Sequence, residues 1–545
     1  MAARDVGIDG VEDFLHPSLR RQLPDPSRLK DMDVAARRLA DAVRQGEAVG
    51  VFGDYDVDGA TSAALLKRFF EAVGGSVEIY IPDRIAEGYG PNLPGLQALQ
   101  RQGARVAVTV DCGITAYEPL AAAAEGGLEV IVVDHHVAEP RLPAARAVVN
   151  PNRLDDESGQ GQLAAVGVTY LLVVAINRVL REAGWYAARP EPDLLQWLDL
   201  VALGTVCDVV PLTGVNRVLV AQGLKVMARR GNQGLAALAD VAGLSTAPDA
   251  YHAGFILGPR VNAGGRVGEC RLGATLLSTA DAAEARTLAE RLDRYNLERR
   301  EIEAACLAAA IEQVERNGAG DGLVYASAEG WHAGVIGIVA GRLRERYNRP
   351  ACVVARENGV GKGSGRSVRG VDLGAAVLAA RQSGLLINGG GHRMAAGFTV
   401  AEDAEPAFRD FLAARIAAEI GPGGLAPTLR LDGALQGTAA TVELLQALDA
   451  LSPFGAGNPR PRFALPAMRI LKADVVGEQH VRCFVGGEGP GRLKAIAFRA
   501  VGDGLGPALL RSSGLPLHLA GHLQLDRWQG RDDVQLIIED AAPVA

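Results

Sequence analysis

Short apolar runs, rich in β-branched residues and apolar on both faces, recur along the first 150 positions of the chain. They occupy residues 48–52, 76–81, 106–110, 128–133 and 145–149. Such runs are typical of strands buried in a parallel sheet. Ala- and Leu-rich stretches of helical character, such as 60–73 and 116–125, lie between them. The alternation predicts a doubly wound α/β domain.

A long helix is predicted after this domain, because residues 281–317 are highly charged and free of proline, and three nearby glycines follow them. An earlier helix is expected over 193–206. A second α/β unit is expected after the long helix, with strands near 323–326 and 351–354.

The last part of the chain has a different pattern. Residues 421–427 (GPGGLAP) are a candidate linker, and a hairpin is expected around Gly530. Five short strands are expected at 467–476, 481–485, 493–498, 516–523 and 534–539. Five strands in a segment of this length fit a small barrel of the OB type. The expected domains are a first α/β domain over 1–280, a linking helix over 281–317, a second α/β domain over 318–420 and an OB-like domain over 425–545, a fold that often binds nucleic acids.

Charge is distributed unevenly along the 545 residues. The whole chain has 56 Lys and Arg against 64 Asp and Glu, a net charge of -8. Residues 318–400 nevertheless hold ten basic and five acidic residues. One basic region in an acidic chain keeps nucleic-acid binding open, and a carboxylate-rich half is compatible with metal binding.

The spacing of the cysteines and the length of the apolar stretches bear on the cellular location of the protein. The six cysteines include no CxxC pair, so neither a zinc site nor a redox motif is indicated. The longest apolar stretch, 163–176, is shorter than the ~20 residues of a membrane span. The first residues lack a basic-then-apolar signal sequence. We therefore expect a cytoplasmic protein without a membrane segment.

Acidic residues and histidines follow three of the predicted strands. Residues 54–59 (DYDVDG) follow the first strand, Asp111 follows the third, and residues 134–136 (DHH) follow the fourth. In an open parallel sheet these positions meet at one edge. Carboxylates gathered there repel one another unless divalent cations neutralise them. Asp208, after the 193–206 helix, is a fourth candidate.

Each acidic segment alone has a simpler interpretation. The sequence DxDxDG is also part of a calcium loop, but the glutamate that would end such a loop is missing. A single Asp after a strand is most often a cap or a turn residue. The combination of three acidic segments after three strands favours a metal site.

These segments resemble the motifs of a known family. DYDVDG (54–59), VDCGIT (110–115), DHH (134–136) and CDVVPL (207–212) are similar, in this order, to four motifs of the DHH phosphoesterases. GGGHRMAAGF (389–398) resembles the glycine-rich motif of the associated DHHA1 domain. Together with an OB-like tail, the set is similar to the 5′-to-3′ single-strand-specific DNA exonucleases of this family.

The resemblance implies roles for the acidic cluster. It implies two Mn²⁺ or Mg²⁺ ions, with Asp111 as a bridge between them, and a catalytic His136 that faces the phosphate. Asp134 would orient the histidines, and Asp54 would support its loop without binding an ion. The implied metal ligands are Asp56, Asp58, Asp111, His135 and Asp208. Some relatives have a further histidine where this chain has Phe52, so one metal is expected to be held more weakly or to prefer Mg²⁺.

Two glycine-containing segments carry basic residues. KGSGRSVRG (362–370) is expected to be a glycine-rich turn, and PDRIAEGYG (82–90) places Arg84 after another strand. By resemblance, Arg84, Ser364 and Arg366 would form a pocket for a 5′-phosphate. A surface ion pair is an equally good interpretation of Arg84 from sequence alone. His392 in the glycine-rich motif, and Arg260 with Arg266 in GPRVNAGGRVG (258–268), are further candidates for substrate contacts.

The function implied is metal-dependent 5′-to-3′ hydrolysis of single-stranded DNA to mononucleotides, in DNA repair and recombination. An alternative is a phosphodiesterase of short oligonucleotides or cyclic dinucleotides, although such relatives lack an OB-like tail. A catalytically inactive DNA-binding scaffold is a second alternative. We expect a monomer, and the resemblance implies single-strand-binding protein and a RecQ-type helicase as partners.

Overall fold

The computed structural model describes residues 2–318, 322–421, 423–487, 491–502, 504–512, 514–528 and 531–544, without the side chains of residues 2, 527, 528, 531 and 532. The chain forms two compact units, which are described separately. The larger unit combines Asp25–Asp208 with Gly223–Pro427. The smaller unit combines Met1–Pro24, Val209–Gln222 and Thr428–Ala545.

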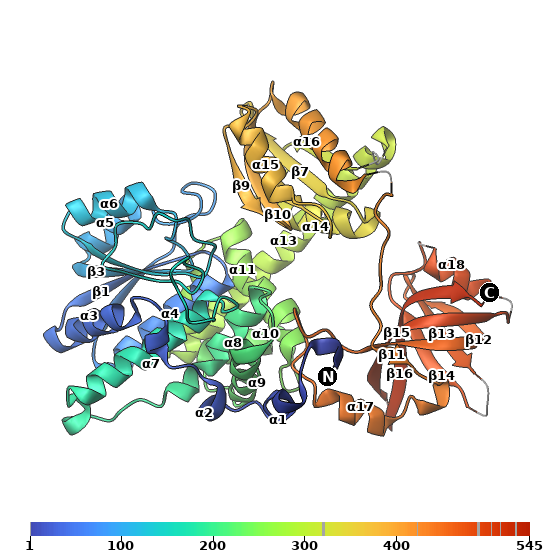
Figure 1. Cartoon of the computed structure of the whole chain (residues 1–545), viewed down its shortest axis with the longest axis horizontal. Helices are drawn as coiled ribbons and strands as arrows, with labels where there is room; N and C mark the ends of the chain where they lie inside the picture. Colours follow the sequence, from blue (N-terminus) through green and yellow to red (C-terminus); the bar gives the residue numbers. More distant parts are fainter. Residues whose placement is uncertain are drawn as a thin grey trace. The chain divides into compact units, whose positions relative to one another are not determined.

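A parallel sheet with the strand order β2-β1-β3-β4-β5 forms the first layer of the larger unit. Its strands are β1 (Ala48–Gly53), β2 (Ser76–Tyr80), β3 (Ala104–Val110), β4 (Glu129–Val133) and β5 (Ala147–Val149). Figure 1 shows helices on both faces of this sheet. One face has α3 (Met32–Gln45), α4 (Val57–Val73) and α7 (Ala165–Glu182), and the other has α5 (Leu93–Arg101) and α6 (Tyr117–Glu125). The predicted doubly wound α/β fold is confirmed.

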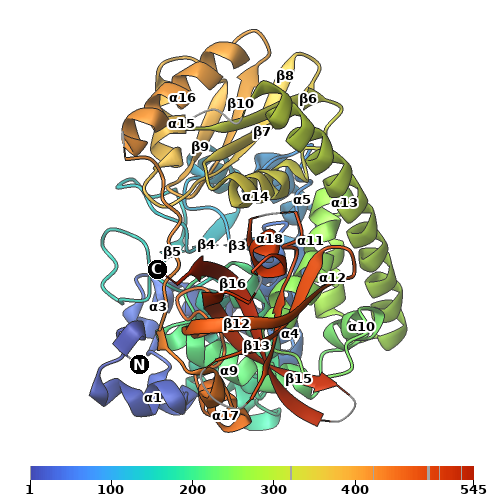
Figure 2. The same ribbon diagram turned by 90° about the vertical axis from the view of Figure 1, so that its right-hand side faces the viewer.

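A group of helices follows the sheet and ends in one very long helix. The group consists of α8 (Leu198–Cys207), the last residues of α9 (Gly214–Ala228), of which 223–228 belong to this unit, α10 (Gln233–Val241), the π-helix η6 (His252–Leu257), α11 (Gly258–Val267) and α12 (Leu272–Ser278). The long helix α13 (Ala282–Asn317) has 36 residues. Asp281 caps it by accepting hydrogen bonds from the backbone N–H groups of Ala283 and Glu284. Figure 2 shows α13 rising from this group to the second sheet, as the sequence predicted.

The second sheet of the larger unit is mixed, with the order β6-β7-β8-β10-β9. Its strands are β6 (Val324–Glu329), β7 (Ala351–Glu357), β8 (Val360–Arg366), β9 (Asn388–His392) and β10 (Ala395–Ala401). The helices are α14 (Ile336–Tyr347), α15 (Leu373–Gln382) and α16 (Glu405–Ile420). Phe398 and Phe408 pack at a centroid distance of 4.7 Å inside this part.

The expectation of a glycine-rich turn at 362–370 is wrong, because the first half of this segment is strand β8. Side chains on a strand alternate between its two faces. A Cβ atom on Gly363 would lie 2.0 Å from the ring of Phe398, and one on Gly365 would lie 2.6 Å from Leu373. The glycines therefore occupy the face that is covered by bulky side chains, while Ser364 and Arg366 occupy the opposite face.

The smaller unit contains a six-stranded sheet with the order β11-β12-β13-β14-β16-β15. An additional pairing of β12 with β15 closes it into a barrel, so the predicted OB-type fold is confirmed. The tip of the expected hairpin at Gly530 lies outside the described residues, and β15 and β16 on either side of it pair antiparallel. The strands are β11 (Gly433–Ala434), β12 (Arg462–Val476), β13 (His480–Gly486), β14 (Leu493–Ala497), β15 (Pro516–Trp528) and β16 (Arg531–Pro543).

Short helices accompany this barrel. They are α1 (Val11–Leu15), α2 (Leu19–Gln22), α17 (Val442–Asp449) and α18 (Leu505–Leu510). The buried Arg217 joins separate segments of the unit, because its guanidinium donates hydrogen bonds to the backbone carbonyls of Phe14, Leu451 and Ser452. In the part of the chain that the structure describes, no helix is long and apolar enough to cross a membrane.

The close approach at Gly363 gives a test of the second sheet. We expect Gly363→Ala to destabilise this sheet by roughly 1–3 kcal/mol, because the added methyl group overpacks the site against Phe398. Hydrogen exchange of the β8 and β10 amides should show a correspondingly lower opening free energy. Gly397 on β10 is the matched control, because a Cβ atom there meets nothing within 4 Å. Equal protection in both variants would contradict the packing described here.

Candidate metal and phosphate site

The acidic segments and histidines gather at the carboxyl edge of the first sheet. Residues 54–58 follow β1, Asp111 follows β3, and residues 134–136 follow β4. Asp208 joins them as the residue that ends α8. The topology therefore brings together the residues that the sequence placed after separate strands.

Local backbone geometry fixes the positions of Asp111 and Asp56. The backbone of Asp111 has a φ of 62°, a left-handed conformation that is uncommon outside glycine and often marks functional sites. Its N–H donates a hydrogen bond to the carbonyl of Val133 on the neighbouring strand. Asp56 caps α4, because its Oδ1 accepts hydrogen bonds from the N–H groups of Asp58 and Gly59. The other oxygen of Asp56 remains available to a ligand.

Asp58 is held by a different helix. Its two carboxylate oxygens accept hydrogen bonds of 2.7 and 2.8 Å from the backbone N–H groups of Ala165 and Val166, at the start of α7. The positive end of a helix dipole favours a carboxylate at this position. Asp58 is 1% exposed, and its Oδ2 lies 3.9 Å from His135 Nε2.

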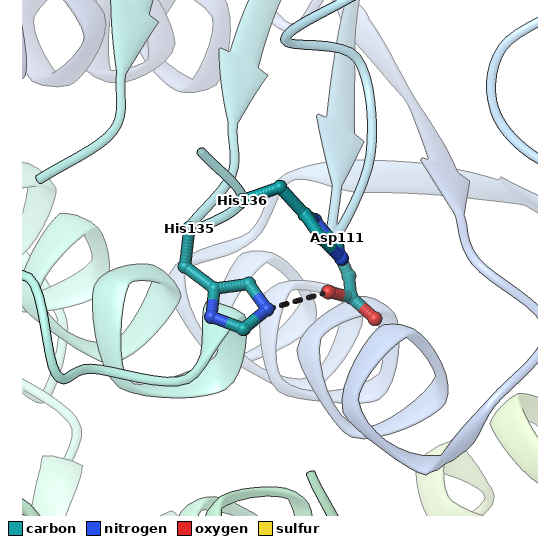
Figure 3. Close-up of side chains that lie close together, drawn as sticks. All are labelled: Asp111, His135 and His136. Carbon is teal, nitrogen blue, oxygen red and sulfur yellow. Dashed lines mark ion pairs between the residues drawn. The ribbon is translucent and has the colours of Figure 1, made fainter. Parts of the chain in front are cut away.

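His135 lies at the centre of the cluster. Its Nε2 is 3.3 Å from Asp111 Oδ1 and 3.6 Å from Asp208 Oδ2. Figure 3 shows the side chains of Asp111 and His135 pointing toward each other. Potential ligand atoms lie within 4.8 Å of one another in three overlapping sets: Asp58, His135 and Asp208; Asp54, Asp56 and Asp111; and Asp111, His135 and His136.

The charge state of the cluster indicates that it needs a cation. Burial, reinforced by the neighbouring carboxylates, raises the pKa of Asp58 to about 7 and that of Asp208 to about 9. The pKa values of Asp54 and Asp111 are raised well above the usual range for the same two reasons. Four buried atoms here have no hydrogen-bond partner among the described residues: Asp54 Oδ1, Asp111 Oδ1, His135 Nε2 and Asp208 Oδ2. Oxygen-rich sites with one imidazole suit Mg²⁺ or Mn²⁺, so these residues fit a divalent-metal site.

His136 has a separate set of contacts. Its Nδ1 lies 2.7 Å from Asp134 Oδ1. Burial alone would lower the pKa of His136, but the hydrogen bond to Asp134, together with the negative charges of Asp134, Asp208 and Asp54, outweighs burial and raises the pKa to about 9. The hydroxyl of Tyr89 lies 3.3 Å from the same Nδ1 and donates a hydrogen bond to the carbonyl of Asp111. The Nε2 atom of His136 is therefore left for a ligand.

Phe52 and Asp54 differ in their surroundings although they are close in sequence. Phe52 is completely buried and stacks on Tyr80 at a centroid distance of 5.3 Å, so this position belongs to the hydrophobic core. Asp54 was expected only to support its loop. Its carboxylate nevertheless lies in the same set of potential ligands as Asp56 and Asp111.

Arginines form a second cluster in the same unit. Burial, and then the positive charge of Arg84, lower the pKa of Arg366 and lower that of Arg266 to about 10. Arg366 donates a hydrogen bond to Ser364 Oγ, and Arg84 lies over the ring of Tyr55 with its Cζ 4.9 Å from the ring centroid. Among the described residues, none of these three arginines forms an ion pair with a carboxylate. A cluster of unneutralised guanidiniums is suited to a dianionic phosphate.

The start of α14 adds to this cluster. A Cβ atom on Gly337 would lie 3.0 Å from Ser364 Oγ and 3.1 Å from a terminal nitrogen of Arg366. The first turn of a helix carries free N–H groups and a partial positive charge that favour anions. Gly337 therefore keeps space open next to Ser364 and Arg366, where a phosphate group can approach.

The two remaining candidates for substrate contacts have different surroundings. Arg260 forms an ion pair of 2.8 Å with Asp293 and donates a hydrogen bond to the carbonyl of Ile256, so its guanidinium is already engaged. His392 lies on β9, where burial and the charges of Arg366 and His136 lower its pKa. His392 thus lies within electrostatic range of both clusters.

Comparisons with known proteins agree with this geometry. Residues 48–205 match the N-terminal domain of the DHH family, residues 320–418 match the DHHA1 domain, and residues 431–540 match the RecJ OB domain. The single-stranded-DNA-specific exonuclease RecJ of Dickeya dadantii is 38% identical, over 96% of this chain and 92% of that protein. The chain belongs to the RecJ family. The protein of the same name from Escherichia coli is 36% identical, over 97% of this chain and 93% of that protein.

Solved structures of RecJ are also similar. RecJ from Thermus thermophilus in complex with Mn²⁺ superposes with a TM-score of 0.82 and 32% identity, covering 98% of this chain and 74% of that chain. The complex of the same protein with Mg²⁺ has a TM-score of 0.76 and 31% identity, covering 100% of this chain and 76% of that chain. These structures support divalent-metal use in this RecJ-family chain.

Three residues near the two clusters were not singled out from the sequence. Tyr55 lies between two acids of the first motif, Tyr89 lies five residues after Arg84, and Gly337 is one of many glycines. The sequence carries only a weak signal for each of them, because their partners Arg84, His136 and Ser364 come from other elements.

The geometry predicts opposite effects of one substitution on stability and on metal binding. Asp111→Asn should raise the melting temperature of the metal-free protein at neutral pH, because burying the Asp111 carboxyl beside other acids raises its pKa and costs stability, and a neutral amide avoids that cost. It should also weaken Mn²⁺ binding at least tenfold, as measured by calorimetry. His136→Ala should keep its Mn²⁺, and Asp410→Asn, which changes an exposed acid, should behave like the wild type. Unchanged Mn²⁺ affinity in Asp111→Asn would contradict the assignment of the metal site.

Proposed function

We propose that this chain is a metal-dependent exonuclease that hydrolyses single-stranded DNA from its 5′ end to mononucleotides, in DNA repair and recombination. The observation that carries the proposal is a cluster of acids and a histidine, four of whose buried atoms have no hydrogen-bond partner among the described residues, in the same unit as arginines that form no ion pair there. The relatives named single-stranded-DNA-specific exonuclease RecJ support the substrate class. The OB domain favours a polymeric substrate over a dinucleotide.

The metal ligands in this proposal are those that the resemblance implied. Asp111 belongs to two of the three sets of potential ligands, which supports a bridging position between two ions. Divalent cations bound here would supply an activated water and offset the charge of the leaving oxygen. The proposed ligands are Asp56, Asp58, Asp111, His135 and Asp208, with Asp54 as a sixth candidate.

His136 acts on the phosphate in this proposal. Asp134 is fully buried and accepts hydrogen bonds from the backbone N–H groups of Ile114, His135 and His136. Its carboxylate is therefore fixed, and it holds His136 by Nδ1. His136 can then present Nε2–H to a phosphate oxygen and stabilise the charge that develops there.

Hydrolysis that proceeds only from 5′ to 3′ requires recognition of the 5′ end of the strand. A 5′-phosphate carries a dianion, which Arg84, Ser364 and Arg366 would bind by charge-assisted hydrogen bonds. Arg266 extends this set, since its pKa responds to both Arg84 and Arg366. The arginines would then hold the terminal phosphate, while the acidic cluster holds the ions at the bond to be cut.

The direct test is hydrolysis of labelled DNA with MnCl₂. The full chain should release mononucleotides from the 5′ end of a single-stranded 40-mer, and should act much more slowly on the blunt duplex and on a dinucleotide. Preference for the dinucleotide would instead support a phosphodiesterase of short oligonucleotides. Cleavage starting from the 3′ end would contradict the proposed polarity.

Arg366→Ala tests the phosphate cluster. We expect its affinity for 5′-phosphorylated strands to fall roughly tenfold or more, because it loses a charge-assisted hydrogen bond. Strands that end in a 5′-hydroxyl should be affected much less. The measurement is the ratio of hydrolysis rates on the two substrates. The exposed Arg369, three residues along, is the matched control for a general loss of positive charge. A parallel fall on both substrates would mean that Arg366 does not read the strand end.

Tyr55 should position Arg84 through the contact between its ring and the guanidinium. Tyr55→Phe keeps the ring and should preserve the preference for 5′-phosphorylated strands. Tyr55→Leu removes the ring and should reduce that preference several-fold while leaving Mn²⁺ affinity unchanged. Calorimetry with MnCl₂ and the ratio of the two hydrolysis rates separate these effects. A loss of Mn²⁺ binding in Tyr55→Leu would show instead that the ring supports the metal loop.

A further inference from the structure

Two asparagines follow β5, the strand that pairs with β4 at the edge of the first sheet. Asn150 and Asn152 belong to the sequence NPNR (150–153), directly after the last residue of β5. Asn150 is completely buried, and Asn152 is half-buried. Their side chains reach across to the two histidines that follow β4.

All four backbone polar groups of His135 and His136 are bonded to side chains. Asp134 Oδ1 accepts hydrogen bonds from the N–H groups of both histidines. Asn152 Nδ2 donates a hydrogen bond to the carbonyl of His135, and Asn150 Nδ2 donates one of 2.9 Å to the carbonyl of His136. Backbone groups that are removed from water need such partners, which a sheet no longer supplies beyond the end of a strand. Each histidine carbonyl therefore has an asparagine of its own.

The two histidine rings are adjacent in sequence but have different surroundings. Their centroids are 4.6 Å apart, and their planes are inclined at 58°. His135 Nε2 lies near Asp111, whereas His136 Nδ1 is bonded to Asp134. A rotation of the peptide plane between the two histidines would move both rings. A hydrogen bond to each carbonyl fixes the orientation of its peptide plane, and thereby the direction in which each ring leaves the backbone.

The turn that carries the asparagines is itself fixed. Asn150 Oδ1 accepts a hydrogen bond of 2.7 Å from the N–H of Asn152, which forms an Asx turn. Pro151, between them, has a restricted φ. The buried Arg153 donates a hydrogen bond to the carbonyl of Val148 on β5. The Asx turn uses only the oxygen of Asn150, so the amide nitrogens of both asparagines are free to bind the histidine carbonyls.

Asn152 also connects His135 to the segment that holds Asp58. Its Nδ2 donates a second hydrogen bond, of 3.1 Å, to the carbonyl of Gly161. A Cβ atom on Gly161 would lie 2.6 Å from Asn152 Oδ1, so glycine permits this approach. Gly161 lies four residues before α7, whose first N–H groups bind the Asp58 carboxylate. One amide group therefore joins the backbone of one proposed metal ligand to the segment that holds another.

We propose that Asn152 positions His135 for metal binding and that Asn150 positions His136 for its action on the phosphate. This inference rests on the proposed function, which assigns His135 to an ion and His136 to the phosphate. Asparagine suits both places because it supplies an N–H donor without adding a charge, whereas an ionised aspartate only accepts hydrogen bonds. The two asparagines are two positions apart, yet they should affect different steps.

The first test separates metal binding from turnover. Asn152→Ala should bind Mn²⁺ at least fivefold more weakly by calorimetry, because His135 is no longer held toward the other ligands. Asn150→Ala should keep its Mn²⁺ affinity within twofold. Its kcat on a 5′-phosphorylated single-stranded 20-mer at saturating MnCl₂ should fall at least tenfold with little change in KM, because only transition-state stabilisation is lost. Unchanged values in both variants, or a parallel loss of affinity and kcat in both, would overturn the proposal.

Asn232 is the matched control for the loss of a buried amide. It is also buried, its Nδ2 donates a hydrogen bond to the carbonyl of Leu277, and its Oδ1 accepts one from the N–H of Leu235 at the start of α10. Asn232→Ala should lower the melting temperature as the two test variants do, but leave Mn²⁺ affinity and kcat unchanged. A loss of Mn²⁺ affinity or kcat in Asn232→Ala as large as in the test variants would reduce Asn150 and Asn152 to structural residues.

Asn150→Asp is the second variant if Asn150→Ala does not fold. It fills the same volume and keeps the acceptor for the N–H of Asn152, but at pH 8 its ionised carboxylate has no donor for the carbonyl of His136. It should show the same tenfold loss of kcat without weaker Mn²⁺ binding. Wild-type kcat in Asn150→Asp would overturn the role of Asn150.

A measurement without metal or DNA distinguishes the positioning from the nuclease function. In the full chain with ¹⁵N-labelled histidine in EDTA, Asn152→Ala should shift the ring resonances of His135 most, and Asn150→Ala those of His136. Unshifted resonances of both histidines would overturn the positioning even in an active exonuclease. A wild type that neither binds Mn²⁺ nor cuts DNA would contradict the proposed function, while the resonances would still decide which asparagine holds which histidine.

Discussion

Mutual repulsion of buried carboxylates is the constraint on which the larger unit depends. Asp54, Asp58, Asp111 and Asp208 all have raised pKa values, because each is removed from water next to other acids. The scaffold compensates for part of this repulsion with helix starts. Asp56 caps α4 and Asp58 accepts two N–H groups of α7, so partial positive charges offset two of the acids. The remaining charge is left to a cation, which makes metal affinity a consequence of the fold.

Much of this arrangement could be predicted from the sequence because it follows from topology. Alternating apolar runs and helical stretches imply a parallel sheet, and acids after successive strands then meet at one edge. Asp111 and His135 lie where this reasoning placed them, whereas Asp208 follows a helix and was a candidate through the family resemblance. The left-handed backbone of Asp111 could not be predicted, since nothing in VDCGIT specifies it. Neither could the position of Asp54 among the potential ligands, because it depends on how residues from separate strands come together.

The glycine-rich segments show a different limit of sequence reasoning. Glycine at every second position was interpreted as a turn, although the same spacing is compatible with a strand that has one crowded face. Deciding between them requires knowing that Phe398 and Leu373 lie opposite Gly363 and Gly365. Those two residues belong to other elements, so the sequence of this segment alone does not show that they lie opposite its glycines. The strand assignment matters for function, because it fixes Ser364 and Arg366 on a rigid element.

The acids and the arginines do not neutralise each other, although they lie in the same unit. Arg84 is near enough to favour the charged form of Asp54 and to lower the pKa of Arg366, yet it forms no ion pair among the described residues. The guanidinium of Arg84 lies over the ring of Tyr55. The guanidinium of Arg366 donates hydrogen bonds to Ser364 Oγ and to the carbonyl of Gly365 on β8. These contacts hold the two arginines in place, so they do not form ion pairs with the acids. Each cluster is therefore left without an opposite charge of its own among the described residues, and this is the basis of the proposal that the acids bind a cation and the arginines a phosphate.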